Sequence, residues 1–351
     1  MTSVPLIEAV DLAKNFQVLN KQTGFLGGVR TLFSRDYREI QAVAGVSFAI
    51  APGELVGYLG PNGSGKSTTI KMLTGILHPS AGRVVVDGLV PHRERMRNSR
   101  RIGVVFGQRT QLEYNLPARD TFILLRKLYA VPRARHEATL AQLTDLLGLG
   151  DLLDRPVRLL SLGERMRCEL VAALLHEPPI LFLDEPTIGL DVVAKERMRA
   201  FIRQLNQERG TTILLTTHDL VDIEQLCRRV IIIDKGIVIY DGTLAAIKRQ
   251  YGRERTITFS LLDDGAGAPP PEQLAHELAE LGEGLTVSQR EDATIAVGFD
   301  PRLVAATDLT RQIVNRYPVA DLAVAEADLG MIIREIYAAS GQGVVDAPRT
   351  V

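Results

Sequence analysis

The sequence lacks the features that mark disulfide-rich, nucleic-acid-coating and membrane-spanning chains. Cys168 and Cys227 are its only cysteines, too few for a disulfide framework or a cysteine metal site, and they fit a reducing compartment. The formal net charge of −1 argues against a protein whose main task is to coat nucleic acid. No apolar run approaches about 18 residues, and the first residues show no signal pattern. If the protein acts at a membrane, we expect another chain to span it.

One stretch, ELVGYLGPNGSGKSTTIKMLTGIL at 54–77, predicts a strand, a glycine-rich turn and a helix in succession. An apolar run covers Leu55–Leu59, and a helical pattern runs from Ser67 to Leu77. Glycines in the turn permit backbone dihedrals that aim successive N–H groups at a phosphate chain, at the positive end of the following helix. Lys66 can reach the β- and γ-phosphates, and the Ser67 hydroxyl can bind Mg²⁺. The stretch therefore predicts a nucleoside triphosphate site rather than a plain turn. The predicted nucleotide-binding residues are Gly60, Pro61, Asn62, Gly63, Ser64, Gly65, Lys66, Ser67 and Thr68.

Two carboxylates follow a second apolar run. Ile180–Leu183 is typical of a strand buried on both faces of a parallel sheet, and it leads into Asp184 and Glu185. Ligands of open α/β sheets bind at the carboxyl ends of the strands. We therefore expect Asp184 to hold Mg²⁺ and Glu185 to orient and polarise the attacking water. A helix cap is the structural alternative for this pair. His218, after the apolar run 211–216, is placed for catalysis, although a lone histidine is more often a core or surface residue.

The chain resembles the ATP-binding subunit of ATP-binding cassette (ABC) transporters over roughly residues 4–245. The motifs that carry the resemblance occur in the order of that family. They are the Walker A loop GPNGSGKST, the Q-loop residue Gln108, the signature LSLGE at 160–164, the Walker B strand ILFLDE, the D-loop GLD ending at Asp191, and the switch residue His218. The chain is most similar to the subgroup that serves exporters with a separate permease, such as drug and sodium exporters.

The resemblance implies an ATP hydrolase that works as a dimer on transmembrane permease subunits, at the cytoplasmic face of the cell membrane and without a nucleic-acid partner. Each ATP would lie between the Walker motifs of one subunit and the signature of a second ATPase subunit, identical or different. Ser161 and Gly163 would then contact the γ-phosphate in trans. Gln108 would lie on the γ-phosphate and Mg²⁺ side, and His218 would hold the γ-phosphate and the attacking water. The residues expected to act in catalysis are Glu185, His218, Lys66 and Gln108, and those expected to bind Mg²⁺ are Ser67, Gln108 and Asp184.

Other nucleotide contacts follow the family pattern less closely. In the family an aromatic ring near the first strand usually stacks on adenine, which makes Phe16 the candidate and Tyr37 the second choice. Asp191 of the D-loop is expected to adjoin the nucleotide. The usual signature LSGGQ is LSLGE here, with Leu162 and Glu164 as the departures. Because the serine and the second glycine remain, we expect a competent site.

The expected fold is an α/β P-loop ABC ATPase domain followed by a small accessory α+β domain. The 351 residues leave room for about two domains with an ordinary globular core. The ATPase domain, with an antiparallel β subdomain and a helical subdomain at about 108–175, is placed at 1–250, and the accessory domain at 251–345. The accessory domain has the pattern β-α-β-β-α-β plus a helix, which fits a ferredoxin-like fold. Its predicted strands are 255–262, 285–290, 293–299 and 319–325, and its predicted helices are 272–281, 302–316 and 328–339.

Three further segments need interpretation. Residues 17–40 separate strands predicted at 4–10 and 42–50, and they fit either an elongated hairpin with a short packed helix or an amphipathic helix at a partner or membrane surface. They also resemble an extra helix in the ATPases of polysaccharide exporters. The basic run 91–101 is interpreted as a solvated face. Residues 118–149 are predicted to be helical, with leucines that pack in the core. These leucines are Leu124, Leu125, Leu128, Leu140, Leu143, Leu146 and Leu147.

Two rival functions fit the motifs less well. Soluble ABC ATPases of translation or DNA metabolism usually carry a second cassette or a long coiled-coil or zinc insertion, and neither occurs in this sequence. The basic run is the main support for that alternative. A kinase or other P-loop transferase would not need LSLGE, GLD and His218.

Overall fold

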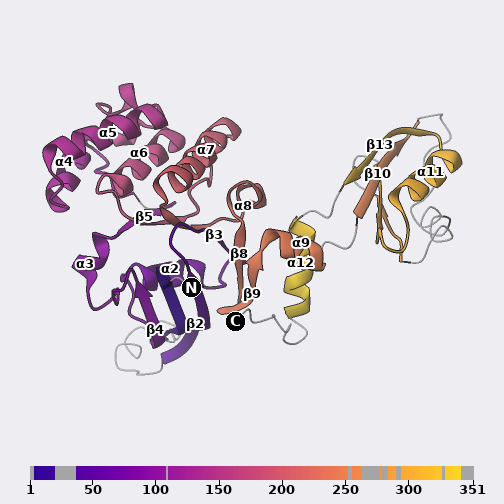
Figure 1. The fold of residues 1–351 in the computed structure, drawn as a ribbon, viewed down its shortest axis with the longest axis horizontal. Helices are drawn as coiled ribbons and strands as arrows, with labels where there is room; N and C mark the ends of the chain where they lie inside the picture. The colour runs from indigo at the N-terminus through magenta and orange to yellow at the C-terminus, as the bar shows by residue number, and fades with distance from the viewer. Residues whose placement is uncertain are drawn as a thin grey trace, which may run out of the picture. The chain divides into compact units, whose positions relative to one another are not determined.

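The computed structural model describes residues 4–19, 37–107, 110–251, 255–262, 277, 284–289, 294–325 and 329–340. The chain divides into two compact units, one that covers residues 1–242 and one that starts at Thr243 (Figure 1). The predicted domain boundary at residue 250 stays a prediction. None of the described helices has the length and apolar character that crossing a membrane requires.

The first unit is built on a large sheet whose described strands lie in the order β4-β1-β2-β9-β8-β3-β7-β6-β5. The strands are β1 (Ile7–Leu19), β2 (Tyr37–Ile50), β3 (Leu55–Leu59), β4 (Ala81–Val86), β5 (Ile102–Phe106), β6 (Ile180–Asp184), β7 (Thr212–Thr216), β8 (Arg229–Asp234) and β9 (Ile237–Thr243). β5, β6, β7, β3 and β8 run parallel, whereas β1 pairs antiparallel with β2 and β4. Every residue of β3 and β7 is buried, as their continuous apolar runs predict. The carboxyl ends of β3, β7 and β6 therefore lie side by side at one edge.

β1 and β2 form a hairpin that is longer than predicted. The sequence predicts strands at 4–10 and 42–50, but the pairing continues outward as far as Leu19 and Tyr37. Its outer residues are half-buried or exposed, so no apolar alternation marks them, and the backbone ladder defines the strands there. The described strands therefore fit an elongated hairpin, one of the two interpretations of this segment. The helix predicted within 17–40 is not tested, because residues 20–36 lie outside the described residues.

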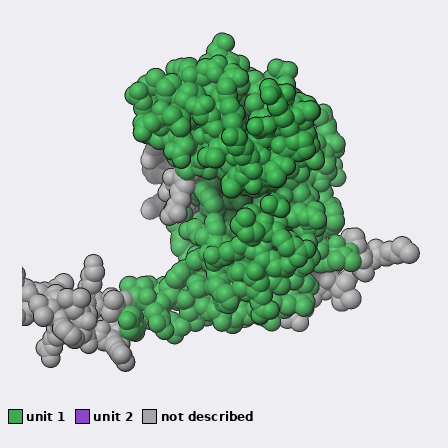
Figure 2. Space-filling model, turned by 90° about the vertical axis from the view of Figure 1, so that its left-hand side faces the viewer, with its two compact units in different colours: residues 1–242, 347–351 green, residues 243–346 purple. Residues whose placement is uncertain are grey.

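The helices of this unit are α2 (Lys66–Leu73), α3 (Arg95–Ser99), α4 (Ala118–Leu128), α5 (Arg133–Leu147), α6 (Leu162–Leu174), α7 (Val192–Arg209) and α8 (Leu220–Leu226). α6 packs against α4 and α5, and these helices gather at one end of the unit, away from β2 and β4 (Figure 1). Figure 2 shows one face of the unit, which is hollowed between an upper and a lower mass of side chains.

Two predicted helices end or break earlier than expected, and glycine and proline explain both cases. α2 ends at Leu73 rather than at Leu77, because Gly75 adopts a left-handed φ of 78°. The helical region predicted at 118–149 is two helices, because Ala130 takes a φ of 54° and Pro132 cannot continue a helix.

The assignment of the α4 and α5 leucines to the core is wrong for three of them. Leu124, Leu128 and Leu146 expose 55%, 61% and 41% of their surface, whereas Leu143 and Leu147 are buried. Helical spacing alone does not show which apolar face of a helix meets the core, and α4 presents one to solvent. The basic run 91–101, in contrast, exposes all of its arginines, as the prediction of a solvated face requires.

The second unit contains a smaller sheet whose described strands lie in the order β11-β12-β10-β13, with each pair antiparallel. Its elements are α9 (Leu244–Tyr251), β10 (Arg255–Leu261), β11 (Thr286–Gln289), β12 (Ile295–Phe299), α11 (Ala306–Arg316), β13 (Val319–Ala325) and α12 (Leu329–Ser340). β12 lies between β10 and β11, as a split β-α-β arrangement requires. α11 begins later than predicted because Asp300 holds the preceding turn, where its Oδ1 accepts the Arg302 N–H at 2.9 Å. The predicted helix 272–281 lies outside the described residues, apart from Glu277.

Candidate functional site

The loop between β3 and α2 forms a cradle because two of its glycines occupy positions closed to other residues. Gly65 precedes α2 with a φ of 104°, and a Cβ there would lie 2.6 Å from the Ala42 carbonyl oxygen. A Cβ on Gly60 would lie 2.3 Å from Ser64 Oγ. In the described structure no side chain caps the start of α2. The first N–H groups of this helix are therefore free of side-chain acceptors and suit an anion.

Lys66 lies across this loop and is almost fully buried. Its Nζ donates to the Gly60 carbonyl oxygen at 2.6 Å and to the Pro61 carbonyl oxygen at 3.1 Å. Burial lowers the pKa of Lys66, while the charges of Glu185 and Asp184 act in the opposite direction. The predicted phosphate-binding cation is thus electrostatically coupled to both predicted carboxylates.

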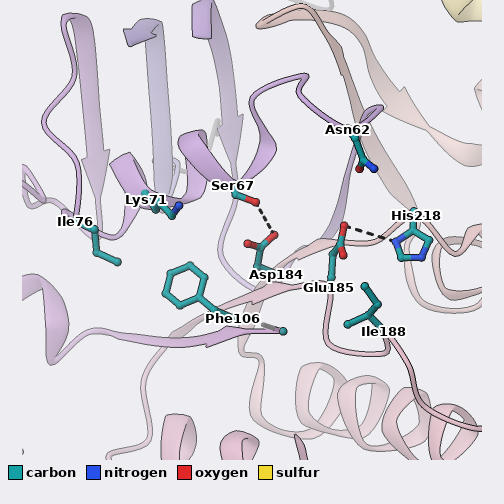
Figure 3. A pocket seen from close by; sticks show the side chains of 10 residues that line it. Asn62, Ser67, Lys71, Ile76, Phe106, Asp184, Glu185, Ile188 and His218 are labelled. Carbon is teal, nitrogen blue, oxygen red and sulfur yellow. Dashed lines mark hydrogen bonds and ion pairs between the residues drawn. The ribbon is translucent and has the colours of Figure 1, made fainter. Parts of the chain in front are cut away.

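The carboxyl ends of β6 and β7 place Asp184 beside Ser67. Asp184 Oδ1 accepts a hydrogen bond from Thr216 Oγ1 at 2.6 Å and one from Ser67 Oγ at 3.4 Å, the second of which is drawn in Figure 3. A carboxylate and a hydroxyl are hard oxygen ligands, so this pair suits Mg²⁺. No motif in the sequence marks Thr216. The sequence feature that could have identified Thr216 is its position: it is the polar last residue of a buried strand, just before Thr217 and His218.

Glu185 and His218 face each other across the same cavity (Figure 3). Glu185 Oε1 lies 3.6 Å from His218 Nδ1. The backbone of Glu185 has a φ of 55°, which is uncommon for a residue other than glycine, and its N–H donates to the Thr216 carbonyl oxygen at 3.0 Å. Such backbone conformations concentrate at functional sites. The structure therefore brings the carboxylate predicted to polarise the attacking water and the predicted switch histidine together.

A cavity of about 670 Å³ collects these groups (Figure 3). Its lining residues are Asn62, Ser67, Lys71, Ile76, Phe106, Gly107, Asp184, Glu185, Ile188 and His218. A second cavity of about 290 Å³ shares Asn62, Ser67 and Glu185 with the first, so the two adjoin. Its other lining residues are Ala42, Gly63, Gly65, Lys66 and Thr68. Gly60, Pro61 and Ser64 belong to the same loop without lining either cavity. The lining also includes Lys71, Phe106 and Ile188, which belong to none of the motifs identified in the sequence.

The signature residues lie at the start of α6 and do not line either of these cavities. Ser161 Oγ accepts the Glu164 N–H at 3.3 Å, and Glu164 Oε2 accepts the Ser161 N–H at 2.8 Å, which together form a capping box. The bond from the Ser161 N–H lowers the pKa of Glu164. Glu164 thus has a structural reason to occupy the position of the family glutamine. Of the described signature residues, neither Ser161 nor Gly163 reaches the chain's own phosphate loop cavities.

The other departure in the signature, Leu162, packs against the D-loop of the same chain. A Cβ on Gly189 would lie 2.7 Å from Leu162 Cδ2. Two residues later Asp191 caps α7, with Oδ1 accepting the Ala194 N–H at 2.8 Å. Asp191 therefore acts as a helix cap in this chain, and its contact with nucleotide stays a prediction.

The candidates for adenine stacking lie on the hairpin. Phe16 is half-buried on β1, with Lys14 Nζ 5.3 Å from the centre of its ring. Tyr37 begins β2 and exposes 50% of its surface. Neither residue lines the two cavities described above, so adenine stacking stays a prediction for both. Gln108 lies outside the described residues.

Comparison with known proteins finds relatives along most of the chain. Residues 43–188 match the family model described as ABC transporter. The chain is 37% identical over 224 residues to the ABC transporter ATP-binding protein NatA of Bacillus subtilis. The aligned region covers 64% of this chain and 89% of that protein. The chain is also 36% identical over 260 residues to the Nod factor export ATP-binding protein I of Paraburkholderia xenovorans. This aligned region covers 72% of this chain and 81% of that protein.

A solved structure agrees with these relatives. It is described as a dimeric, post-hydrolysis state of the ATP-binding cassette MJ0796 bound to ADP and Pi. It matches with a TM-score of 0.56 at 25% identity, over 68% of this chain and 98% of that chain. The rival role in translation or DNA metabolism is not favoured by these matches. The match to most of the length of NatA, on top of the phosphate-loop geometry, shows that the chain belongs to the ATP-binding proteins of ABC transporters and is an ATP hydrolase.

Proposed function

We propose that this ATPase binds Mg²⁺ and ATP at the carboxyl ends of β3, β6 and β7 and powers the export of a solute through a separate permease. The observation that carries the proposal is the cavity in which Ser67, Asp184, Glu185 and His218 meet, adjoining the hollow lined by Lys66. These side chains come from distant parts of the sequence. Phosphoryl transfer needs positioning and charge neutralisation more than covalent chemistry, and this set of groups offers both.

The triphosphate is proposed to lie over the glycine-rich loop, at the start of α2. Backbone N–H groups and the positive end of the helix favour an anion there. Burial lowers the pKa of Lys66, but phosphate oxygens next to the ammonium favour its charged form. Lys66 is therefore expected to stay protonated when ATP is bound.

Mg²⁺ is proposed to bind Ser67 and Asp184, with Gln108 as the further ligand that the family resemblance implies. The ion, when bound, supplies positive charge that offsets the charge of the β- and γ-phosphates. The hydrogen bond from Thr216 Oγ1 orients the carboxylate of Asp184 from the side of β7.

Glu185 is proposed to take the proton from the attacking water. The water oxygen forms a bond to the γ-phosphorus while the bond from that phosphorus to the oxygen of ADP breaks. The bond from the Glu185 N–H to β7 restricts the residue that carries this carboxylate. His218, beside Glu185, is proposed to hold the γ-phosphate and the water.

A second ATPase subunit, identical or related, is proposed to supply Ser161 and Gly163. The signature does not line the phosphate loop cavities of its own chain, and the matching cassette structure is described as dimeric. A site completed by a partner is competent only when the pair has closed, which couples hydrolysis to a conformational change.

Export through a permease rests on the relatives. One of them is named for Nod factor export, and we infer that the present chain also docks on transmembrane permease subunits at the cytoplasmic face of the membrane. The permease, rather than this chain, would then select the solute.

The catalytic assignment is tested by Glu185→Gln. We expect ATP to bind with unchanged affinity and hydrolysis to fall to background, because the amide cannot accept the proton. Phosphate release and the binding of a fluorescent ATP analogue measure the two quantities. Glu208→Gln, on the exposed face of α7, is the matched control and should behave as wild type. Wild-type hydrolysis by Glu185→Gln would remove that residue from the mechanism.

The transport assignment is tested by purifying the tagged chain from gently solubilised membranes and identifying its companions by mass spectrometry. We expect a polytopic membrane protein in stoichiometric amount. Co-purification with ribosomes or nucleic acid instead would contradict the transport assignment while leaving the nucleotide chemistry intact.

A further inference from the structure

A buried carboxylate joins the two loops that carry Glu185 and His218. Asp222, in α8, is fully buried. Its Oδ2 accepts hydrogen bonds from Thr187 Oγ1 and from Thr217 Oγ1, the second at 3.1 Å. Thr187 stands two residues after Glu185, and Thr217 stands directly before His218. One carboxylate oxygen therefore links the segment after β6 to the segment after β7.

The other oxygen of Asp222 is held by a buried cation. Arg199 of α7 is 5% exposed, and its Nε donates to Asp222 Oδ1 at 2.6 Å. The same guanidinium donates through Nη1 to Glu196 Oε1 at 2.6 Å. Because an unpaired buried charge is strongly unfavourable, the pair has little freedom to separate. Asp222 is thus a fixed point to which both loops are bonded.

The segment on the far side of His218 is tied to the same group of residues. Asp219 Oδ2 accepts from Lys195 Nζ at 2.6 Å and lies 3.6 Å from Arg199 Nη2. The Asp219 N–H also donates to Thr217 Oγ1 at 3.0 Å. The side chain of His218 itself is 62% exposed, so its surroundings constrain it little. The bonds of the residues on either side of it therefore hold the backbone segment that carries the imidazole.

We propose that Asp222, neutralised by Arg199, is a positioning residue for ATP hydrolysis. It fixes the two loops so that Glu185 Oε1 and His218 Nδ1 lie 3.6 Å apart. The inference rests on the roles that the proposed function gives to Glu185 and His218. A displacement of about 1 Å in a catalytic group can cost about a hundredfold in rate, so loosening these loops should slow the chemical step.

ATP affinity should respond differently from the rate. Lys66 and Ser67, which are assigned to the phosphates and Mg²⁺, begin α2, and none of the hydrogen bonds found among the described residues joins either of them to Asp222. A positioning role predicts a fall in kcat with little change in KM. A merely structural role predicts less folded protein, with the remaining molecules fully active.

The test compares Asp222→Asn and Thr217→Val with a control ion pair in the same unit. Arg229 Nε and Nη2 bond the two carboxylate oxygens of Asp241 at 2.8 Å each. Asp241→Asn therefore removes the charge of another arginine–aspartate pair, which is more exposed than the Arg199–Asp222 pair and does not touch Glu185 or His218. Thr217→Val keeps the shape of the side chain and leaves the Arg199 to Asp222 pair intact. Steady-state hydrolysis and thermal unfolding are measured for each purified full-length variant.

We expect Asp222→Asn to lower kcat about tenfold or more and Thr217→Val to lower it several-fold, both with KM for ATP within about twofold of wild type. Asp241→Asn should keep wild-type kcat. If Asp222→Asn does not fold, Thr217→Val and Thr187→Val decide the question alone. Wild-type kcat in the folded Asp222 or threonine variants would overturn the proposal, as would an equal loss in Asp241→Asn. Glu185→Gln is assayed in parallel. If it hydrolyses ATP normally the proposed function fails, whereas an inactive Glu185→Gln beside fully active Thr217→Val overturns only this inference.

Discussion

Two helices begin at the motifs of the site, and the chain treats their first N–H groups in opposite ways. α2 begins after Gly65 with no side-chain cap among the described residues. α6 begins after Ser161 with a complete capping box formed by Ser161 and Glu164. Every helix start leaves N–H groups without intrahelical partners. Those of α2 are available to an anion, whereas some of those of α6 are already bonded by the chain itself.

For the proposed composite site, the difference indicates which half is formed within a single chain. The phosphate loop has Asp184, Glu185 and His218 around its cavity within one chain. The signature is capped by its own residues and, in the proposed dimer, offers Ser161 to the phosphate of a partner. Changes in the two halves should therefore affect different quantities: ATP affinity of the isolated chain for the first, and hydrolysis by the assembled pair for the second.

The largest contrast is expected between Gly65→Ala and Gly163→Ala. A Cβ on Gly65 would lie 2.6 Å from a backbone oxygen at a φ of 104°, whereas a Cβ on Gly163 would make an ordinary contact, 3.5 Å from Ala194 Cβ. Gly65→Ala should weaken ATP binding by about a hundredfold or more, because the loop must move. Gly163→Ala should leave ATP binding by the isolated chain within about twofold, since alanine suits a helix. Titration with a fluorescent ATP analogue measures the affinity of both variants. Equal losses of affinity would contradict the difference between the phosphate loop and the signature.

A smaller effect is expected for the cap of α6. Ser161→Ala removes the Oγ that accepts the Glu164 N–H, so the free energy of unfolding should fall by about 1 kcal/mol. ATP affinity of the isolated chain should not change. Ser99→Ala, at the end of α3, serves as the control and should stay within about 0.5 kcal/mol of wild type. Urea unfolding checks the stabilities, and a loss of ATP affinity in Ser161→Ala would show that the signature acts within its own chain.

The smallest effect concerns the charge of Glu164. Its folded pKa is lowered chiefly by the bond from the Ser161 N–H. The ionised carboxylate of Glu164 therefore contributes to the free energy of unfolding. This contribution is fully present above the unfolded pKa of about 4.5 and is lost as the pH falls through the folded pKa. Glu164→Gln keeps a capping box but not the charge, so it should be a few tenths of a kcal/mol less stable at neutral pH. The difference should vanish in strongly acidic buffer. The midpoints of urea unfolding at neutral and at strongly acidic pH measure the stability of Glu164→Gln and of wild type. A stability difference that is the same at both pH values would contradict the charge effect.

The sequence predicts those parts of the molecule that rest on local patterns. The bounds of β3 coincide with the apolar run Leu55–Leu59, and the glycine-rich turn leads directly into α2. Asp184 and Glu185 are predictable because they follow a buried strand. The pairing of Glu185 with His218 at one edge follows from parallel strands that end together.

Features that depend on tertiary contacts are not predictable in this way. The outer hairpin lacks apolar alternation, and the exposed leucines of α4 share the spacing of core leucines. Glu164 could be read as a loss of the family glutamine until the structure shows its bond to Ser161. Asp222 carries no motif, and only the fold brings it to Thr187 and Thr217.

Mixing two inactive variants tests the division between phosphate loop and signature most directly. Lys66→Ala disables the first half, and Ser161→Arg blocks the second without touching the first. If ATP is hydrolysed between two copies, a mixed pair holds one site with both changes and one site with neither. We expect that combining the two inactive proteins restores ATP hydrolysis, and that Lys66→Ala combined with Glu185→Gln, two changes in the same half, does not. No recovery in the first mixture, or equal recovery in both, would contradict it.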